Sequence, residues 1–525
     1  MNRSVHRMTV TLLGLAVVGL GLGAVPAMAD VRLPHVLGDH MVLQRDVPVP
    51  IWGWAEPGEA ITITFGSHEV STAADADGAW SVKLPPLKAG GPHELVVNGK
   101  ANTVRVADVL VGEVWVCSGQ SNMEMGIGVV QDGEKEAAAA DYPKIRLFEL
   151  PRRPSGQRAD DINATWRICH PDTIAEGRWG GFSALGYFFG RELHQELGVP
   201  IGLIDSAWGG TRIEPWTPPC GFAAVPKLHE ISEEIERANA DYRRSLPNSL
   251  AAIEEWIANT RSVLAAGEEL LPPTPRWPRH PLEGAGNPTG LYNGMIHPLV
   301  PFAIRGAIWY QGESNVHSAD GMMYFEKMKA LVGGWREVWG QGDFPFYYVQ
   351  LSPFNYKFHV RDMSPYLMPE VWEAQTAALA IPNTGMAVTT DIGNLRDIHP
   401  RNKVDVGKRL ALWAFAKTYG HDGLVYSGPL YKSSVAENGR IKVSFDHVGG
   451  GLASRDGKPL TRFEIAGKDK QFVEAQAEIV GETVEVWSDD VSDPVAVRFG
   501  WHMEAEPNLM NKEGLPASPF RTHPW

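Results

Sequence analysis

Four short polar turns hold the residues of this chain that are best suited to catalysis. Acyl transfer by serine needs a hydroxyl nucleophile, a base for its proton, a group that orients the base and donors that face the developing oxyanion. Residue types for all of these parts occur in the turns 118–123 (SGQSNM), 206–211 (SAWGGT), 311–315 (QGESN) and 397–400 (DIHP).

Ser121 is the candidate nucleophile, because a strand-to-helix turn places it at a helix N-terminus, which stabilises negative charge. His399 is the candidate base, since Pro400 disfavours helix at the residue before it. Asp397 lies two residues earlier, on the same side of an extended backbone, and is a candidate to orient the histidine. Taken singly, each residue is explained as well by a turn or by packing, and the combination favours catalysis.

The oxyanion would be stabilised by donors from two of the turns. A backbone N–H of Gly209 or Gly210 can approach a substrate closely, because glycine has no side chain to block it. Gln311 adds a side-chain amide. These donors complement the negative charge that develops on a carbonyl oxygen under attack.

The turns are predicted to follow buried parallel strands, since short and nearly continuous apolar runs are typical of strands covered on both faces. These runs are Val109–Cys117, Val199–Asp205, Ala303–Tyr310, Pro345–Leu351 and Met386–Asp391. Helices are predicted from Leu185 to Leu197, after Ser183 as N-cap and before Gly198, and from Val404 towards Gly420. The alternation predicts an open three-layer α/β/α domain, whose reactive groups gather where parallel strands end.

The alternation of strands and helices spans residues 106–420, and β-rich segments flank it on both sides. Residues 30–105 predict an N-terminal β-sandwich, and residues 421–525 predict a C-terminal β region that is either separate or packed with 30–105. A charged helical stretch and a proline-rich stretch, together about 222–282, predict an insertion near the substrate entrance. A solvated helical hairpin explains that insertion equally well.

The first 29 residues are typical of a secretory signal peptide. Arg3 and Arg7 precede an apolar run from Leu12 to Ala24, and Ala27-Met28-Ala29 forms a small-residue cleavage site. The mature chain would then begin at Asp30 and act in the periplasm or outside the cell, with an uncleaved anchor as the alternative. Its loss changes the net charge from −14 to −16, which argues against nucleic acid or an anionic membrane as partner.

The composition favours neither a metal site nor a disulfide framework. The chain has 525 residues, enough for more than one domain, and three cysteines, Cys117, Cys169 and Cys220, so at most one disulfide can form. No Cys-x-x-Cys pair or metal-ligand spacing occurs. The 18 tryptophans are explained by buried cores or by stacking on sugar rings.

The motifs together resemble the sialate O-acetylesterase family, a branch of the SGNH hydrolases, whose catalytic domain is flavodoxin-like. The resemblance covers most of residues 31–420. It is carried by 38–44 (GDHMVLQ), 119–123 (GQSNM), 208–211 (WGGT), 291–296 (LYNGMI), 309–315 (WYQGESN) and 397–400 (DIHP). It implies Ser121 as nucleophile and His399 as base, an oxyanion hole from the Ser121 backbone, a glycine of the 208–211 turn and Gln311, and no metal or organic cofactor.

Two departures from the SGNH pattern leave choices open. The acid usually lies three residues before the histidine, but Arg396 stands there, so Asp397, Asp391 or a backbone carbonyl orients His399, with Asp397 favoured. Gln311 replaces the usual oxyanion asparagine, with Asn315 the weaker candidate. The residues expected to contact or support the substrate are Gln120, Asn122, Arg212, Glu214, Glu313, Asn315 and Arg396.

The leading hypothesis is hydrolysis of O-acetyl esters on a carbohydrate, through an acetyl-enzyme. The resemblance implies acetylated sialic acid as the substrate, while similar exported enzymes act on plant polysaccharides such as xyloglucan and xylan. The acidic chain favours a plant-type or mixed glycan. The alternatives are a glycosidase that uses Glu313 and Asp397 as paired carboxylates, and a non-catalytic sugar-binding protein.

Overall fold

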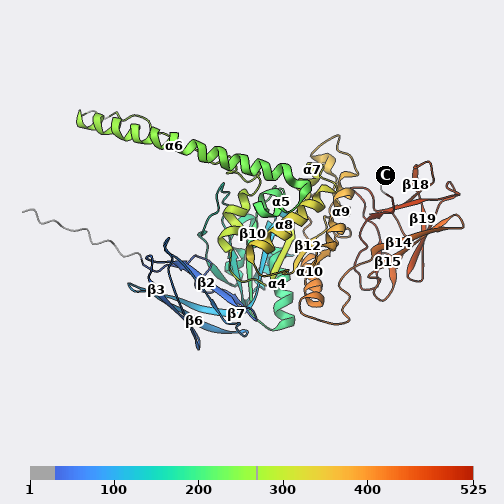
Figure 1. Cartoon of the computed structure of the whole chain (residues 1–525). Helices are drawn as coiled ribbons and strands as arrows, with labels where there is room; N and C mark the ends of the chain where they lie inside the picture. Colours follow the sequence, from blue (N-terminus) through green and yellow to red (C-terminus); the bar gives the residue numbers. More distant parts are fainter. Residues whose placement is uncertain (1–29, 268–269, 524) are drawn as a thin grey trace, which may run out of the picture.

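The computed structural model describes residues 30–267, 270–523 and 525, which form three regions in a row (Figure 1). An N-terminal β region and a C-terminal β region lie at opposite ends of a central α/β domain. The predicted signal peptide, 1–29, lies outside the described residues. No helix in the described part of the chain is both long enough and apolar enough to cross a membrane.

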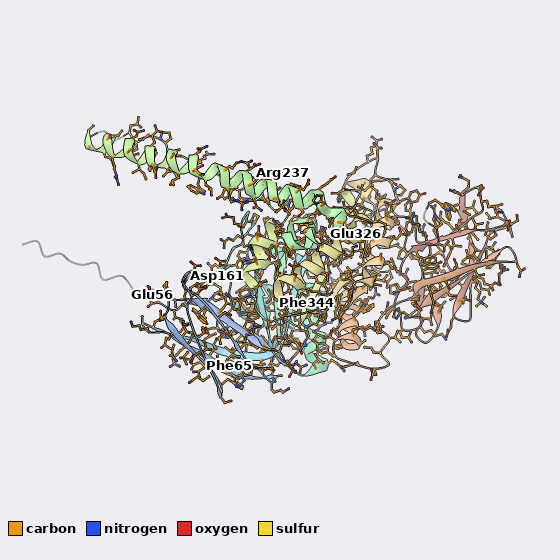
Figure 2. The ribbon with its side chains drawn as sticks, in the orientation of Figure 1. Glu56, Phe65, Asp161, Arg237, Glu326 and Phe344 are labelled. Atoms are coloured by element: carbon orange, nitrogen blue, oxygen red, sulfur yellow. The ribbon has the colours of Figure 1, made fainter. Side chains whose placement is uncertain are left out.

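The N-terminal region consists of short strands, and in some of them buried residues alternate with more exposed ones. In one strand Ile61, Ile63 and Phe65 are buried, and Figure 2 shows Phe65 within this region. The strands are β1 (Val42–Gln44), β2 (Val49–Trp54), β3 (Ala60–Phe65), β4 (His68–Ala73), β5 (Ala79–Leu84) and β6 (Gly90–Asn98). β2 pairs with β5, while β3, β4 and β6 form a sheet that continues into β7 (Thr103–Gly119).

β7 joins the N-terminal region to the central domain without a break. Its first residues pair with β6, and its last residues pair with two strands of the central sheet. The predicted boundary at 105/106 therefore falls inside a strand. The two regions are therefore joined by one strand that is hydrogen-bonded in both of them, and not by a flexible linker.

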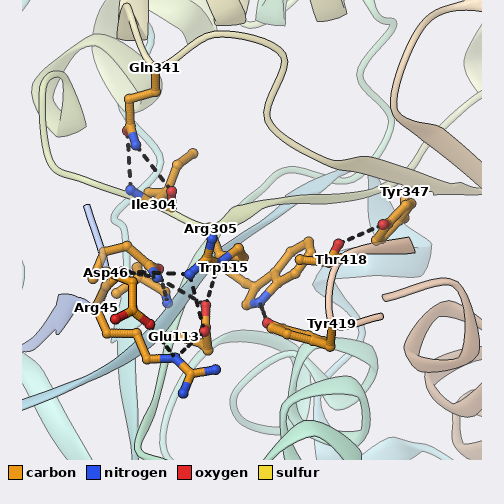
Figure 3. Close-up of polar contacts among 12 residues, drawn as sticks. Arg45, Asp46, Glu113, Trp115, Ile304, Arg305, Gln341, Tyr347, Thr418 and Tyr419 are labelled. Carbon is orange, nitrogen blue, oxygen red and sulfur yellow. Dashed lines mark hydrogen bonds and ion pairs between the residues drawn. The ribbon is translucent and has the colours of Figure 1, made fainter. Parts of the chain in front are cut away.

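A buried ion cluster marks the middle of β7 (Figure 3). The fully buried carboxylate of Glu113 accepts hydrogen bonds from Gln44 Nε2 at 3.0 Å, Arg45 Nε at 2.5 Å and Arg305 Nε at 2.6 Å. Two residues on, Trp115 Nε1 donates to the Tyr419 hydroxyl at 3.2 Å. A buried charge is stable only when it is paired and hydrogen-bonded, and Glu113 meets both conditions.

The central sheet has the strand order β13-β12-β11-β7-β10-β8-β9. All neighbours are parallel except β8 and β9. The strands are β8 (Tyr142–Glu149), β9 (Trp166–Cys169), β10 (Ile201–Ala207), β11 (Gly306–Tyr310), β12 (Phe346–Val349) and β13 (Thr384–Ala387). The parallel strands β7, β10, β11, β12 and β13 overlap the predicted apolar runs, whereas β8, which is parallel to β10, was not predicted. β7 lies between β10 and β11, where the chain crosses from one half of the sheet to the other, which is the usual place for a ligand crevice.

Helices cover both faces of this sheet. Phe346 of β12 contacts Trp335 of α8 (Met323–Trp339), and the next residue, Tyr347, contacts Trp413 of α10 (Lys403–Lys417). Because successive strand side chains point to opposite faces, α8 and α10 lie on opposite sides. The expected three-layer α/β/α class with accessory β regions is thus confirmed.

The remaining helices of the central domain are mostly short. They are α1 (Ser121–Glu124), α2 (Gly133–Ala138), α3 (Pro171–Ala175), α4 (Ala184–Leu197), α5 (Pro219–Ala223), α7 (Glu313–His317) and α9 (Leu367–Ala377). α4 begins as predicted, with Ser183 Oγ accepting from the Gly186 N–H at 3.1 Å, and ends at Gly198, whose φ is +67°.

The insertion contains one long helix, α6 (His229–Ala265), rather than a helical hairpin. α6 stands out from the body as an arm, with Arg237 on its nearer part (Figures 1 and 2). Its distal part leaves Leu250, Ile257 and Leu264 exposed. Pro247 lies inside the helix, which continues through it.

The C-terminal region has its own hydrophobic core, centred on Val443, Ile465 and Phe499. Its strands are β14 (Leu430–Glu437), β15 (Arg440–Asp446), β16 (Leu452–Ser454), β17 (Phe463–Ala466), β18 (Phe472–Glu474), β19 (Gln476–Val480), β20 (Thr483–Trp487), β21 (Ala496–Phe499), β22 (Leu509–Asn511) and β23 (Phe520–Arg521). They pair only with one another among the described residues. The alternative of one composite β domain with residues 30–105 is therefore wrong, because the central domain separates the two regions.

The three cysteines of the chain are free. Cys117 and Cys169 are buried and Cys220 is half-buried. The single disulfide that the odd count left open is not formed in this structure.

Candidate active site

Ser121 is the first residue of α1 and follows β7 directly. The turn depends on Gly119, whose φ is +140° and where a Cβ atom would lie 2.2 Å from the Tyr310 carbonyl oxygen. Only glycine fits at such a position. The chain therefore turns tightly between β7 and β11 and leaves Ser121 at the carboxyl edge of the sheet.

Ser121 and His399 are hydrogen-bonded, with 2.9 Å between Oγ and Nε2. They are 278 residues apart in sequence and meet because the loop before α10 returns to the end of β7. The distance is that of a nucleophile and its general base. Burial lowers the pKa of His399, against the opposing charge of Asp397, so the imidazole is neutral and able to accept a proton near pH 7.

Asp397, the favoured orienting acid, lies beside the histidine. Its Oδ1 is 3.4 Å from His399 Nδ1 and accepts the His399 backbone N–H at 3.0 Å. Asp391, the alternative, is not brought to His399. Its two oxygens are each 2.7 Å from the guanidinium nitrogens of Arg409, in a bidentate pair that holds α10 to the end of the sheet.

Two backbone N–H groups of the cleft wall are open for an oxyanion. Those of Ser121 and Gly210 donate to no group within the described part of the chain, and both residues line the cleft. Gly209 differs, because its N–H donates to Glu124 Oε2 at 2.7 Å. Glu124 thus fixes the 208–211 turn instead of leaving the Gly209 N–H to the substrate.

Gln311 is not an open donor, contrary to the sequence-based expectation. The residue is fully buried, and its Nε2 donates to Gln120 Oε1, the Thr211 carbonyl and Asn315 Oδ1. Asn315, the weaker candidate, is also committed, with Nδ2 donating to Glu214 and Asp320. The long amide of Gln311 satisfies buried acceptors behind the cleft, so it holds the turns together.

Gln120 and Asn122 connect the turns, and of the two only Gln120 also lines the cleft. Gln120 Oε1 accepts from the backbone N–H groups of Gly312 and Ser314 as well as from Gln311. Asn122 Nδ2 donates to the Ile398 carbonyl at 3.0 Å. This last bond ties the helix that begins at Ser121 to the loop that carries His399.

Glu313 and Lys403 are both buried and meet through Asn122. Asn122 Nδ2 donates to Glu313 Oε1 at 2.5 Å, and Lys403 Nζ donates to Asn122 Oδ1 at 2.6 Å. Burial raises the pKa of Glu313 and lowers that of Lys403 to about 7. Glu313 Oε2 is buried without a hydrogen-bond partner in the described residues, and Glu313 lines the cleft.

Like Asn122 and Asn315, three further predicted substrate contacts lie outside the cleft lining. Glu214 is buried and paired with Lys327 at 2.9 Å; burial opposes its ionisation, but Lys327 and Arg212 together lower its pKa. Arg212 faces Glu214 at 3.3 Å. Arg396 is exposed, and its backbone N–H donates to Asn394.

The cleft has a volume of about 380 Å³ and is lined mainly by residues near the ends of the parallel strands. The sequence motifs missed several of these: Glu124, Arg152, Trp179, His317 and His359. Glu124 could have been predicted from the sequence, because it lies one helical turn after Ser121. Arg152 and Trp179 could not, because they belong to loops with no motif. No residue of α6 lines the cleft, so the insertion does not form its wall. In the described residues, no cluster of His, Cys, Asp or Glu could hold a metal ion.

The sequence that forms this site matches known proteins. A family model described as carbohydrate esterase, sialic acid-specific acetylesterase, matches residues 111–253 and 276–415, and its gap falls within the insertion. The sialate O-acetylesterase of Mus musculus is 34% identical over 451 residues, 79% of each chain. That of Homo sapiens is 33% identical over 434 residues, 76% of this chain and 73% of its own.

The comparison extends to a solved structure. A carbohydrate acetylesterase of Xanthomonas citri has 38% sequence identity and a TM-score of 0.78, covering 94% of this chain and 100% of that one.

Proposed function

Because this chain belongs to the sialic acid-specific acetylesterase family of carbohydrate esterases, we propose that it removes acetyl groups from sugars with Ser121 as nucleophile and His399 as base. The chain is a carbohydrate esterase by family. The serine mechanism, the site residues and the substrate are the parts proposed here. The observation that carries the proposal is the 2.9 Å hydrogen bond between Ser121 Oγ and His399 Nε2.

In the first half of the reaction, Ser121 Oγ attacks the acetyl carbonyl carbon while His399 Nε2 takes the hydroxyl proton. The carbonyl oxygen becomes an oxyanion, which the backbone N–H groups of Ser121 and Gly210 stabilise. When the tetrahedral intermediate collapses, the bond from carbon to the sugar oxygen breaks. His399 passes its proton to that oxygen, and the sugar leaves with a free hydroxyl.

In the second half, water replaces the sugar. His399 takes a proton from water as its oxygen attacks the acetyl-Ser121 carbonyl, and it then returns the proton to Ser121 Oγ as acetate leaves. Asp397 stabilises the imidazolium that forms in each half, since its carboxylate lies 3.4 Å from Nδ1. Water and the ester supply all the atoms of the products.

The paired-carboxylate alternative has less support. Glu313 is buried with Oε1 at Asn122, and Asp397 contacts the His399 backbone and ring. A glycosidase needs two carboxyl groups that face the same glycosidic bond. These two carboxyl groups are instead engaged with different partners, Glu313 with Asn122 and Asp397 with His399.

The proposed substrates are O-acetylated sialic acid and O-acetylated plant polysaccharides such as xyloglucan or xylan. The mouse and human relatives are named sialate O-acetylesterases, and the Xanthomonas citri neighbour is described as a carbohydrate acetylesterase. We propose that the enzyme acts in the periplasm or outside the cell, on the strength of the signal-like pattern of Arg3, Arg7 and Leu12–Ala24. Cell fractionation with an antibody checks the location.

The test of the mechanism compares the wild-type chain with Ser121→Ala and His399→Ala. Hydrolysis of para-nitrophenyl acetate should be lost in both variants while circular dichroism and thermal unfolding stay unchanged. Retained activity in both would contradict the proposal. Acetate release from 9-O-acetylated sialic acid and from acetylated xylo-oligosaccharides then decides between the two substrate classes.

A further inference from the structure

Trp179 is an exposed aromatic residue of the cleft that also contacts His399. Its side chain is 40% exposed, and it lines the catalytic cleft. Its indole is also in contact with the base, with ring centroids of Trp179 and His399 4.8 Å apart and the planes at 84°. An exposed large aromatic residue beside a catalytic group exposes apolar surface that a ligand can cover.

The backbone around Trp179 is held in an unfavourable conformation. Trp179 has φ 44° and ψ 48°, in the left-handed region, which is uncommon for a bulky residue. Its neighbours Gly177, Gly180 and Gly181 have φ values of 132°, 90° and 114°. Strain of this kind persists only where surrounding contacts impose it, and it is concentrated at functional sites.

Arg178 supplies those contacts. Its backbone N–H donates to Glu149 Oε1 at 3.2 Å, its Nε to Glu124 Oε1 at 3.2 Å, and its Nη1 to the Leu150 carbonyl at 2.7 Å. Glu124 also holds the Gly209 N–H. One buried carboxylate therefore fixes both the turn beside the nucleophile and the loop that carries Trp179.

The position of Trp179 identifies what it would touch. In the proposed mechanism His399 Nε2 returns its proton to the oxygen of the departing sugar, so the sugar must lie beside His399. Trp179 lies against His399, so it is next to the leaving sugar. A flat indole presents an apolar face that matches the C–H face of a pyranose ring.

Polar groups complete the site. Arg152 lines the same cleft, and its guanidinium also contacts Glu124. His317 and His359 line it too, with His317 Nε2 and His359 Nδ1 3.3 Å apart. An apolar platform with a few polar side chains is the arrangement that binding pockets use to fix the orientation of a ligand.

We infer that Trp179 is the platform of a subsite that binds the pyranose ring of the leaving sugar. The inference rests on the proposed function, and it adds a residue that determines specificity for the alcohol part of the ester. The acetyl group itself does not depend on this platform. A sugar acetate therefore gains binding energy from Trp179, and a simple alkyl acetate does not.

The test uses two kinds of ester and three variants of the full chain. Trp179→Leu keeps an apolar side chain but removes the aromatic face, while Trp179→Tyr and Trp179→Phe keep a face. For acetylated xylo-oligosaccharides, Trp179→Leu should raise KM about 10-fold, as expected for loss of an aromatic contact. Tyr and Phe should restore most of this loss, and the ratio of sugar ester to ethyl acetate in kcat/KM should fall only for Leu.

The sugar class is read from parallel assays. The same comparison with 9-O-acetylated sialic acid shows whether its ring uses the platform, and a KM effect confined to one sugar assigns the subsite to that class. Trp277→Leu is the matched control, because Trp277 is 50% exposed but lies outside the cleft lining. It should leave both KM values unchanged.

The inference is overturned if Trp179→Leu lowers kcat/KM equally for the sugar esters and for ethyl acetate, which would make Trp179 a support for His399 alone. It is also overturned if Leu changes neither. Failure of the proposed function looks different, because the Ser121→Ala chain would then still hydrolyse acetyl esters.

Discussion

Two polar clusters lie on strand β7 and just beyond its end, and they differ in whether all of their polar groups have hydrogen-bond partners. At Glu113 a fully buried carboxylate is matched by Gln44, Arg45 and Arg305 (Figure 3). Beyond the end of the strand, the cluster around Ser121 contains open groups: the N–H groups of Ser121 and Gly210 lack acceptors in the described chain, and Glu313 Oε2 lacks a donor there.

If the proposed function is correct, the difference separates a polar cluster that serves folding from one that serves chemistry. Buried polar groups are normally satisfied inside the protein, since each unsatisfied group costs free energy. A cluster that is complete has nothing left to offer a ligand. A cluster with open donors at a cleft is completed by the substrate, and most strongly by the oxyanion of the transition state.

Among the variants that test this comparison, His399→Ala should have the largest effect. We expect kcat/KM for para-nitrophenyl acetate to fall about 10⁴-fold, because the nucleophile loses its base. The urea midpoint of unfolding should not change, as the cluster is not part of the folding core. His421→Ala, at a histidine outside the cleft lining, should leave both quantities unaltered. A large drop in stability with His399→Ala would show that the cluster serves folding too.

At the other cluster the effect should be reversed. Glu113→Ala should lower the free energy of unfolding by about 3 kcal/mol, because Arg45 and Arg305 lose their shared carboxylate. The kcat of the molecules that remain folded should equal that of the wild type. Urea denaturation with activity measured in the folded baseline checks both. A change in kcat without a change in stability would contradict the view that the Glu113 cluster serves folding and not catalysis.

Glu124 tests the boundary between the two kinds of cluster, since it is fully paired yet lies in the cleft. Glu124→Ala should reduce kcat about 100-fold, the usual order for a disturbed oxyanion hole, because the turn of Gly209 and Gly210 loses its anchor. Glu124→Gln should retain more activity, since an amide oxygen still accepts from the Gly209 N–H. Equal losses in both variants would mean that the charge facing Arg152 and Arg178 matters more than this bond.

The smallest effects are shifts of the pH profile. His399 must be neutral to act, so kcat/KM rises with pH through its pKa, which burial holds below the usual value. Asp397 raises this pKa and Lys403 lowers it. Asp397→Asn should therefore move the acid limb to lower pH, and Lys403→Met should move it to higher pH. If the acid limbs of both variants stay in place, or shift in the same direction, the charges of Asp397 and Lys403 do not set the pKa of His399.

Much of the central domain could be predicted because its strands are buried on both faces. Such strands leave continuous apolar runs in the sequence, and the polar turns that follow them had to meet at one edge of the sheet. Ser121 and His399 were found in this way. The same logic predicted α4 from its cap residues Ser183 and Gly198.

The partners of the polar side chains could not be predicted. Whether Gln311 faces the cleft or the interior depends on three acceptors from separate turns, and no spacing encodes them. Asp397 was favoured over Asp391 as the orienting acid, but the sequence did not reveal that Arg409 pairs with Asp391. Trp179 was missed because its contact with His399 depends on a strained loop, which sequence periodicity does not reveal.

The continuity of β7 also determines how this enzyme can be shortened or recombined. A truncated version starting near residue 106 would keep every candidate catalytic side chain but cut a strand that runs from Thr103 to Gly119 and delete Gln44 and Arg45. The C-terminal region has a core of its own and joins the catalytic part after α10. Exchange of modules between related enzymes would thus cut a shared strand at the amino end, and at the carboxyl end it would have to preserve the Arg521–Glu373 ion pair and the Gln350–Ser518 hydrogen bond.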